Sequence, residues 1–131
     1  MEQLIINTKS HAALIPITHQ IHSIVKKLQI SNGICLIFCP HTTAGLTINE
    51  NADPDVTHDL LYMLDKLIPW QDKGYRHIEG NSAAHLKASL MGSSVTVIID
   101  RGELQLGTWQ EIYLAEFDGP RTRKIFVKIM V

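Results

Sequence analysis

Histidine, glutamate and asparagine side chains are concentrated in one short stretch, HIEGNSAAH, which runs from residue 77 to residue 85. His77, Glu79 and Asn81 occupy alternate positions, so an extended backbone would point all three side chains the same way. His85 falls about one turn into the helix expected to follow, so its imidazole can lean back toward the same entrance. The stretch predicts either a site with two imidazoles and a carboxylate or an ordinary polar helix start.

A second group of polar side chains, His41-Thr42-Thr43, follows directly after the apolar run GICLIFC. His41 would supply a third imidazole from another part of the chain. Three neutral imidazoles suit Zn²⁺ or a similar transition metal, whereas protonated histidines would hold a phosphate. Because spacing alone does not bring His41 near His77, an ordinary loop histidine is the third interpretation.

Two further polar segments, residues 49–53 and 116–121, stand at the ends of expected strands. Glycines and threonines near a helix start suit an anion, because free backbone N–H groups and hydroxyls can meet its oxygens. Arg121 would add a bidentate phosphate contact. Helix capping is a sufficient explanation for Asp53 and Asn81, so these segments are candidates only.

Composition places limits on the class of protein. The chain has 131 residues, 45% of them apolar and 19% charged, with a net charge of −1. One folded domain spanning residues 1–131 is expected, with a core that needs no disulfide or metal. A nucleic-acid partner would favour a basic excess, which is absent. No apolar run reaches the ~20 residues of a membrane span, and the first residues do not have the pattern of a signal peptide.

The two cysteines lie in one strand-like run, at positions 35 and 39. On a strand they share a face about 13 Å apart, which is too far for a disulfide. We therefore expect small, buried, reduced side chains in a protein of the reducing cytoplasm.

Three helices are predicted from apolar positions at steps of three and four residues. The first runs from about residue 17 to 28 with Thr18 as its cap. The second begins at Pro54 with Asp53 as N-cap, and the third begins at Asn81 or Ser82 and ends at Gly92. The last two helices are expected to bury these residues: Val56, Leu60, Met63, Leu64, Leu67, Ala83, Leu86, Ala88, Leu90 and Met91.

About seven strands are expected around these helices, and the β-rich last third of the chain has short connections that favour antiparallel pairing. The apolar run 33–39 predicts a central strand covered on both faces. The last strand, 124–130, places Ile125, Val127 and Ile129 on one face. Strands and helices in this order give an α+β fold.

Four segments together resemble the YjbQ-like family, described as secondary thiamine-phosphate synthases: HTTAGLTINENADPDV, HIEGNSAAHLKASLMG, GELQLGTWQEI and EFDGPRTRKI. The resemblance extends from about Thr8 to Met130. It implies a two-sheet α+β sandwich that assembles as a homotrimer, with a site near the subunit interface. At that site His41, His77 and His85 would gather around a metal or an anion. The candidate catalytic residues are His41, Glu50, Asp53, His77, Glu79 and His85, and the candidate substrate or phosphate contacts are Thr42, Thr43, Asn49, Asn81 and Arg121.

The reaction implied by the resemblance joins a hydroxymethylpyrimidine diphosphate to a thiazole phosphate and releases pyrophosphate. Such chemistry usually relies on Mg²⁺ at the diphosphate, whereas a histidine cluster suits Zn²⁺, so a divalent ion of either kind is expected. This mismatch fits a synthase activity that is secondary to another role. The alternatives are a metal-dependent hydrolase of another small phosphorylated metabolite and a non-catalytic trimeric phosphate-binding protein.

Overall fold

The computed structural model describes all residues from Met1 to Val131. It contains eight strands, where about seven were expected. Their bounds are β1 Glu2–Asn7, β2 Ala13–Pro16, β3 Gly33–Phe38, β4 Ala44–Glu50, β5 Ser94–Asp100, β6 Glu103–Leu104, β7 Gln110–Glu116 and β8 Thr122–Met130. The expected α+β class is confirmed.

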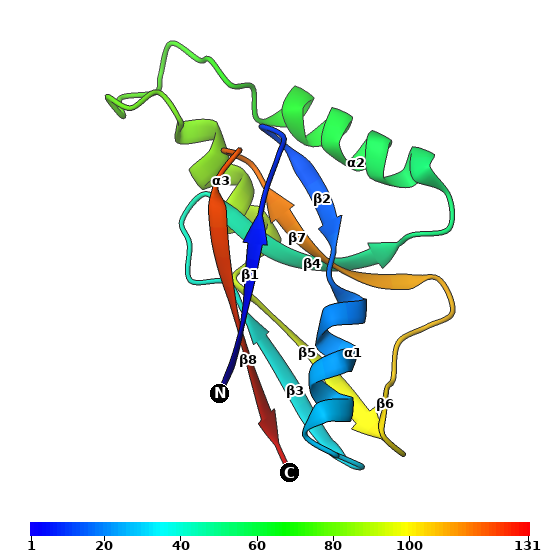
Figure 1. Cartoon of the computed structure of the whole chain (residues 1–131). Helices are drawn as coiled ribbons and strands as arrows, with labels where there is room; N and C mark the ends of the chain where they lie inside the picture. The colour runs from blue at the N-terminus through cyan, green and yellow to red at the C-terminus, as the bar shows by residue number, and fades with distance from the viewer.

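The strands form two antiparallel sheets, one of five strands in the order β1-β8-β3-β5-β6 and one of three in the order β2-β7-β4. Figure 1 shows β4 and β7 running across the direction of β1 and β8, which pass in front of them in this view. β7 pairs with both β2 and β4, so Glu116 at its end lies opposite Ala13 and Ala44. The two-sheet arrangement expected from the resemblance is therefore present.

Three helices cover the sheets: α1 Thr18–Lys27, α2 Pro54–Leu67 and α3 Ser82–Met91. α2 begins as expected, with Pro54 in the first turn and the Asp53 carboxylate accepting a hydrogen bond from the Asp55 N–H at 2.9 Å. The cap expected for α1 is wrong. Thr18 is the first helical residue, and its hydroxyl instead accepts the backbone N–H of Ile112 on β7 at 2.8 Å.

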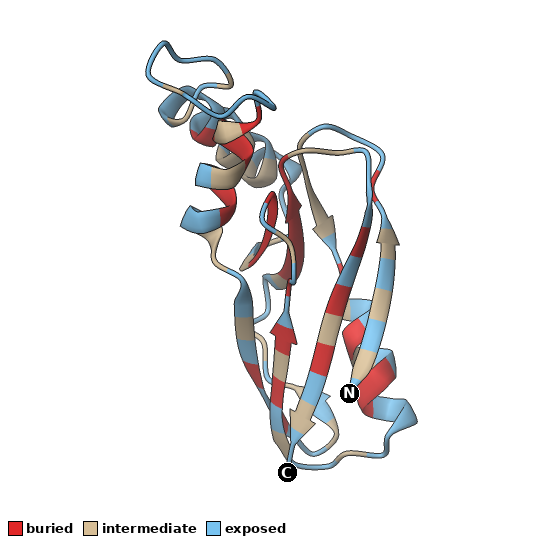
Figure 2. Cartoon of the chain, turned by 90° about the vertical axis from the view of Figure 1, so that its left-hand side faces the viewer, coloured by how far each residue is buried: buried red, intermediate tan, exposed pale blue.

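The main core lies between the sheets and is closed by α1. Ile21 and Val25 of α1, Ile37 of β3 and Leu114 of β7 are all fully buried in it. A smaller cluster, which includes Phe117, packs α2 and α3 against the end of β7. In Figure 2 the red buried positions alternate along the long strands, as a half-covered sheet requires.

Several expected core positions are exposed instead. On α3, Leu86 and Leu90 are 48% and 61% exposed, because the helix turns its small alanines and the aliphatic stem of Lys87 toward the core. On α2, Leu64 is the buried residue, and Met63 and Leu67 face outward. Apolar periodicity alone did not identify the packed face of either helix.

The expectation that residues 33–39 are covered on both faces is also wrong. β3 is central in its sheet, but only Cys35 and Ile37 on the inner face are buried. The outer face, formed by every second residue of β1, β8, β3 and β5, is open in the single chain. Its large exposed apolar side chains are Ile5, Ile34, Phe38, Ile98 and Met130. None of the helices is both long and apolar enough to span a bilayer.

Candidate functional site

Eight of the eleven candidate residues line one cavity of about 400 Å³. It lies where the β3–β4 loop, the entrance to α3 and the β7–β8 turn meet. Its walls are formed by Pro40, His41, Thr42, Thr43, His77, Glu79, Asn81, His85, Arg121 and Arg123. Two hollows of about 480 and 540 Å³ adjoin it, and His85 borders all three. The fold therefore brings His41 into the same site as His77 and His85.

A buried ion pair lies beneath the β3–β4 loop. Glu116 at the end of β7 is fully buried, and its carboxylate accepts hydrogen bonds from Arg123 Nε at 2.9 Å and from Arg123 Nη2. Arg123 Nη2 also donates to the carbonyl and the hydroxyl of Thr43, at 3.2 and 2.9 Å. Thr8 Oγ1 donates to Glu116 at 2.7 Å. Because every partner is buried, the network holds the loop that carries His41 and Thr43 in one conformation.

This network changes the pKa of Glu116. Burial alone would raise that pKa, but the hydrogen bonds from Arg123, the Asp118 N–H and Thr8 outweigh it and hold the pKa below its usual range. The carboxylate is therefore charged, and it neutralises the arginine beneath the cavity.

His41 is held by the backbone of β8. Its Nε2 accepts the N–H of Lys124 at 2.9 Å, so the hydrogen of the neutral ring sits on Nδ1. Burial, followed by the positive charge of Arg123, lowers the pKa of His41. The geometry and the charges both favour a neutral imidazole at this position.

His77 and His85 contact each other edge to face, with ring centroids 5.3 Å apart. His77 Nε2 lies 3.9 Å from the Glu79 carboxylate, which is a long and solvent-exposed ion pair. The alternation of His77 and Glu79 along the chain does bring the two side chains to one side, as the sequence indicated. Neither side chain of this pair is buried, with exposed fractions of 44% for His77 and 73% for Glu79.

Asp118 joins the α3 entrance to the β7–β8 turn. Its Oδ2 accepts hydrogen bonds from Asn81 Nδ2 and from Arg121 Nη2, each at 2.9 Å. Arg121 Nε also donates to the Asp118 carbonyl at 2.8 Å, which aims the guanidinium along the cavity rim. Asn81 occupies the N-cap position of α3, but its side chain makes no capping bond and serves this contact instead. Gly119 is required in the turn, because a Cβ there would lie 2.1 Å from the Ser10 carbonyl.

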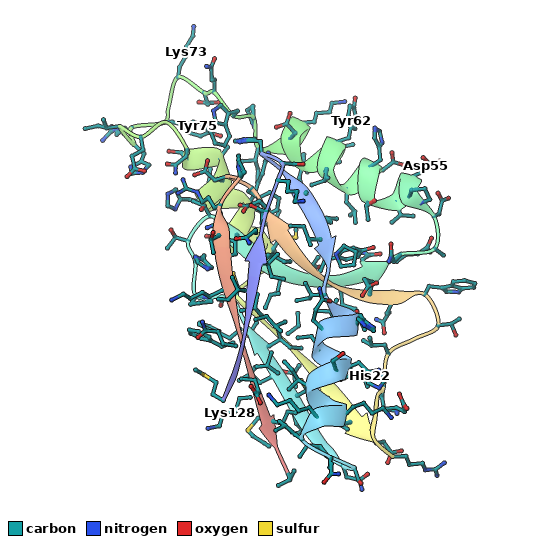
Figure 3. All side chains as sticks on the ribbon, in the orientation of Figure 1. His22, Asp55, Tyr62, Lys73, Tyr75 and Lys128 are labelled. Carbon is teal, nitrogen blue, oxygen red and sulfur yellow. The ribbon has the colours of Figure 1, made fainter.

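Three candidate residues do not reach the cavity: Asn49, Glu50 and Asp53. They lie at the opposite end of β4, about 20 Å away along seven strand residues. Figure 3 shows Asp55, at the start of α2, on the far side of the molecule from Tyr75, which borders the hollow next to the cavity. Asp53 caps α2, and the Glu50 carbonyl accepts the hydroxyl of Tyr113 at 2.9 Å. In a single chain these residues belong to a different surface.

Sequence reasoning assigned no role to Arg123, Glu116 or Asp118, although Glu116 and Asp118 lie within the candidate segment 116–121. A signal was present for two of them. Arg123 shares the parity of Ile125 and Val127 on β8, so it had to face inward. Glu116 continues the inward series of Ile112 and Leu114 on β7 in the same way. A charge on the buried face near one strand end and an opposite charge near another predict a buried pair.

The side chains present do not form a preassembled metal site. No group of three His, Cys, Asp or Glu side chains is close enough to hold an ion. His41 already uses Nε2 as an acceptor for Lys124. Magnesium would want several oxygen ligands, and Glu79 is the single carboxylate in the cavity wall.

The two-sheet fold and the histidine cavity define a class of small α+β protein with a polar site between loops. The chain belongs to the YjbQ family, because the model of that family, described as UPF0047 protein YjbQ-like, matches residues 2–131. The UPF0047 protein YugU of Bacillus subtilis is 50% identical over 130 residues, covering 99% of this chain and 98% of YugU. The UPF0047 protein MJ1081 of Methanocaldococcus jannaschii is 51% identical over 125 residues, covering 95% and 90%.

Solved structures agree with this assignment. A YjbQ/UPF0047 protein from Clostridium acetobutylicum superposes with a TM-score of 0.96 at 55% identity, covering 99% of this chain and 100% of that one. TT1486 from Thermus thermophilus gives 0.93 at 40% identity, also covering 99% and 100%. The names of the first three relatives specify the family, and none of the four specifies a reaction, so the chemistry has to be argued from the cavity.

Proposed function

We propose that the cavity binds the phosphate end of a small phosphorylated metabolite, and that the protein acts as a thiamine-phosphate-synthase-type transferase. The observation that carries this proposal is the lining itself, in which Arg121, Arg123 and Thr43 stand beside three histidines. Arginines and hydroxyls are the groups that proteins use to hold phosphoryl oxygens. The volume of about 400 Å³, extended by the two adjoining hollows, suits a small molecule rather than a macromolecule.

The transfer needs a charged leaving group to be held and protonated. A bond forms between the thiazole nitrogen and the pyrimidine methylene carbon, while the bond from that carbon to the diphosphate oxygen breaks. The arginines would bind the departing pyrophosphate and stabilise its charge. His77 and His85 would then supply a proton to it, since a positioned imidazole can act as a general acid.

A divalent ion is proposed as a companion of the diphosphate rather than as a resident of the protein. Mg²⁺ binds phosphate oxygens directly and keeps several waters, so it needs few protein ligands. Zn²⁺ on His41, His77 and His85 would require His41 to coordinate through Nδ1, because Nε2 is occupied. A metal-specific anomalous scattering experiment on crystals with and without pyrophosphate distinguishes the two.

We further propose that the protein is a homotrimer in the reducing cytoplasm. The open outer face of the five-stranded sheet, with Ile34, Phe38 and Ile98 exposed, supports burial against another copy. Both cysteines are free and buried, as a reducing compartment allows. Sedimentation equilibrium should give three times the 14.7 kDa of one chain; a monomer would contradict the assembly.

The test of the reaction is a coupling assay with both substrates, in which product and pyrophosphate are measured. His41→Ala and His85→Ala should each abolish turnover while the assembly survives. His19→Ala, an exposed position on α1 away from the cavity, is the matched control and should keep full turnover. If both cavity variants stay fully active, the site assignment is wrong.

The competing functions give different results in the same experiment. A hydrolase would release phosphate from one substrate alone, in a panel of phosphate esters with and without chelator. A binding protein would retain phosphorylated compounds and convert none. The exposed pairing of His77 with Glu79 is the feature that favours water activation over transfer.

A further inference from the structure

Arg123 presents an unused donor at the bottom of the cavity. Its side chain is 4% exposed, and Nε and Nη2 are committed to Glu116 and Thr43. Nη1 donates to no protein atom, and the protein does not fully enclose it. It is therefore reachable from the open space that Arg123 lines. A buried arginine with one free nitrogen facing a cavity is prepared to meet an acceptor.

The neighbouring polar groups also have donors left over. Thr43 Oγ1 accepts from Arg123 Nη2, so its own hydrogen is free. His41 accepts through Nε2, so Nδ1–H is its remaining polar group. Thr43 and His41 of the β3–β4 loop therefore have their acceptors engaged by the protein and their donors available, and Arg123 of β8 adds its free Nη1 donor.

We propose that Arg123, which no sequence motif singled out, recognises a phosphoryl group of the ligand through Nη1, with Thr43 and His41 as co-donors and Glu116 as a positioning residue. This inference rests on the proposed phosphate-binding function and names the group that performs it. A phosphoryl group offers several oxygens that only accept, which matches a set of donors approaching from different elements. Glu116 fixes the guanidinium in advance, so binding requires little reorganisation.

The probe is inorganic pyrophosphate, measured by calorimetric titration of the intact protein. Arg123→Lys keeps the charge and a partner for Glu116, but one ammonium cannot hold Glu116 and Thr43 and also reach the ligand. We expect affinity to fall about tenfold or more. Arg101→Lys, in the β5–β6 turn away from the cavity, is the matched control and should bind as the wild type does.

Thr43 provides a second test that leaves the direct contacts between Arg123 and Glu116 in place, although Thr43→Val also removes an acceptor of Arg123 Nη2. Thr43→Val removes the donor and should weaken pyrophosphate binding, whereas Thr43→Ser should restore it. The rise in unfolding temperature caused by pyrophosphate distinguishes a ligand-binding role of Thr43 from a structural role. A purely structural change would lower the unfolding temperature equally with and without pyrophosphate. Wild-type affinity in both Arg123→Lys and Thr43→Val would overturn the inference and leave the proposed function standing. A wild-type protein that binds no phosphorylated probe would overturn the proposed function itself.

Discussion

β4 begins beside the loop that carries His41 and ends beside the first turn of α2, and polar side chains gather at both ends. At the first end the polar groups come from three separate segments, and the buried ion pair of Arg123 and Glu116 lies beneath them. At the second end Asp53 and Glu50 are explained by a helix cap and a backbone contact with Tyr113. Polar residues at a strand end are thus a weak indication of a functional site unless buried charged side chains form hydrogen bonds with the segment that carries them.

The largest expected effect concerns the ion pair under the first end. Arg123→Met should destabilise the protein by about 3–5 kcal/mol, because it leaves the fully buried Glu116 charged and unpaired. Adding Glu116→Gln should recover much of that loss. Urea unfolding gives both free energies.

Lys87 supplies the matched control, since its buried ammonium pairs with Asp65 at 3.0 Å. The Asp65 side chain is 69% exposed, so Lys87→Met leaves a solvated carboxylate and should cost about 1 kcal/mol or less. Equal losses of unfolding free energy in Arg123→Met and Lys87→Met would contradict the view that burial of the Glu116 carboxylate makes its pairing with Arg123 more important than an ion pair with an exposed carboxylate.

Acid should weaken the same end of β4 in two steps. The folded state lowers the pKa of His41, so the unfolded chain binds the proton more readily, and stability should fall as pH drops below about 6.5. The folded state also lowers the pKa of Glu116 and of Asp118, so a further loss should follow below about 4.5 for Glu116 and below about 3.8 for Asp118. Urea midpoints between pH 7.5 and 3.5 measure both. If a His41→Gln variant still loses stability below about pH 6.5, that loss belongs to a group other than His41.

The helix cap at the second end should have a smaller effect. Asp53→Ala removes the acceptor for the Asp55 N–H and should cost about 1 kcal/mol of unfolding free energy. Pyrophosphate affinity should be unchanged, because α2 begins at the end of β4 remote from the cavity. Asp53→Asn retains the cap oxygen and should restore most of the stability, which distinguishes capping from a loss of charge.

The sequence predicted what depends on local pattern, and it failed where packing partners decide. Alternation and turn residues were sufficient to find the strands, and Asp53-Pro54 was sufficient to find the start of α2. Leu86 and Leu90 were misplaced because α3 packs through its alanines, and no periodicity distinguishes a small buried face from a large exposed one.

The site shows the same division. The alternate spacing of His77 and Glu79 correctly predicted side chains on one side of the entrance to α3. His41 was expected in the same site only through the family resemblance, because its position depends on the Lys124 N–H of a strand 83 residues away. Tertiary pairing of β7 with β4 and of β8 with β3 brings the loops together.

The smallest expected effect is that of Glu50→Gln, and it tests most directly whether the two ends of β4 belong to separate sites. Glu50→Gln removes a charge that the resemblance assigns to catalysis but that the fold places about 20 Å from the cavity. Pyrophosphate affinity and turnover should stay within about twofold of the wild type, because a charge at that distance is largely screened. A tenfold loss would mean that Glu50 acts in the cavity of another copy of the chain. The two ends of β4 would then form one site shared across the subunit interface, and the separation seen within a single chain would be a property of the isolated fold.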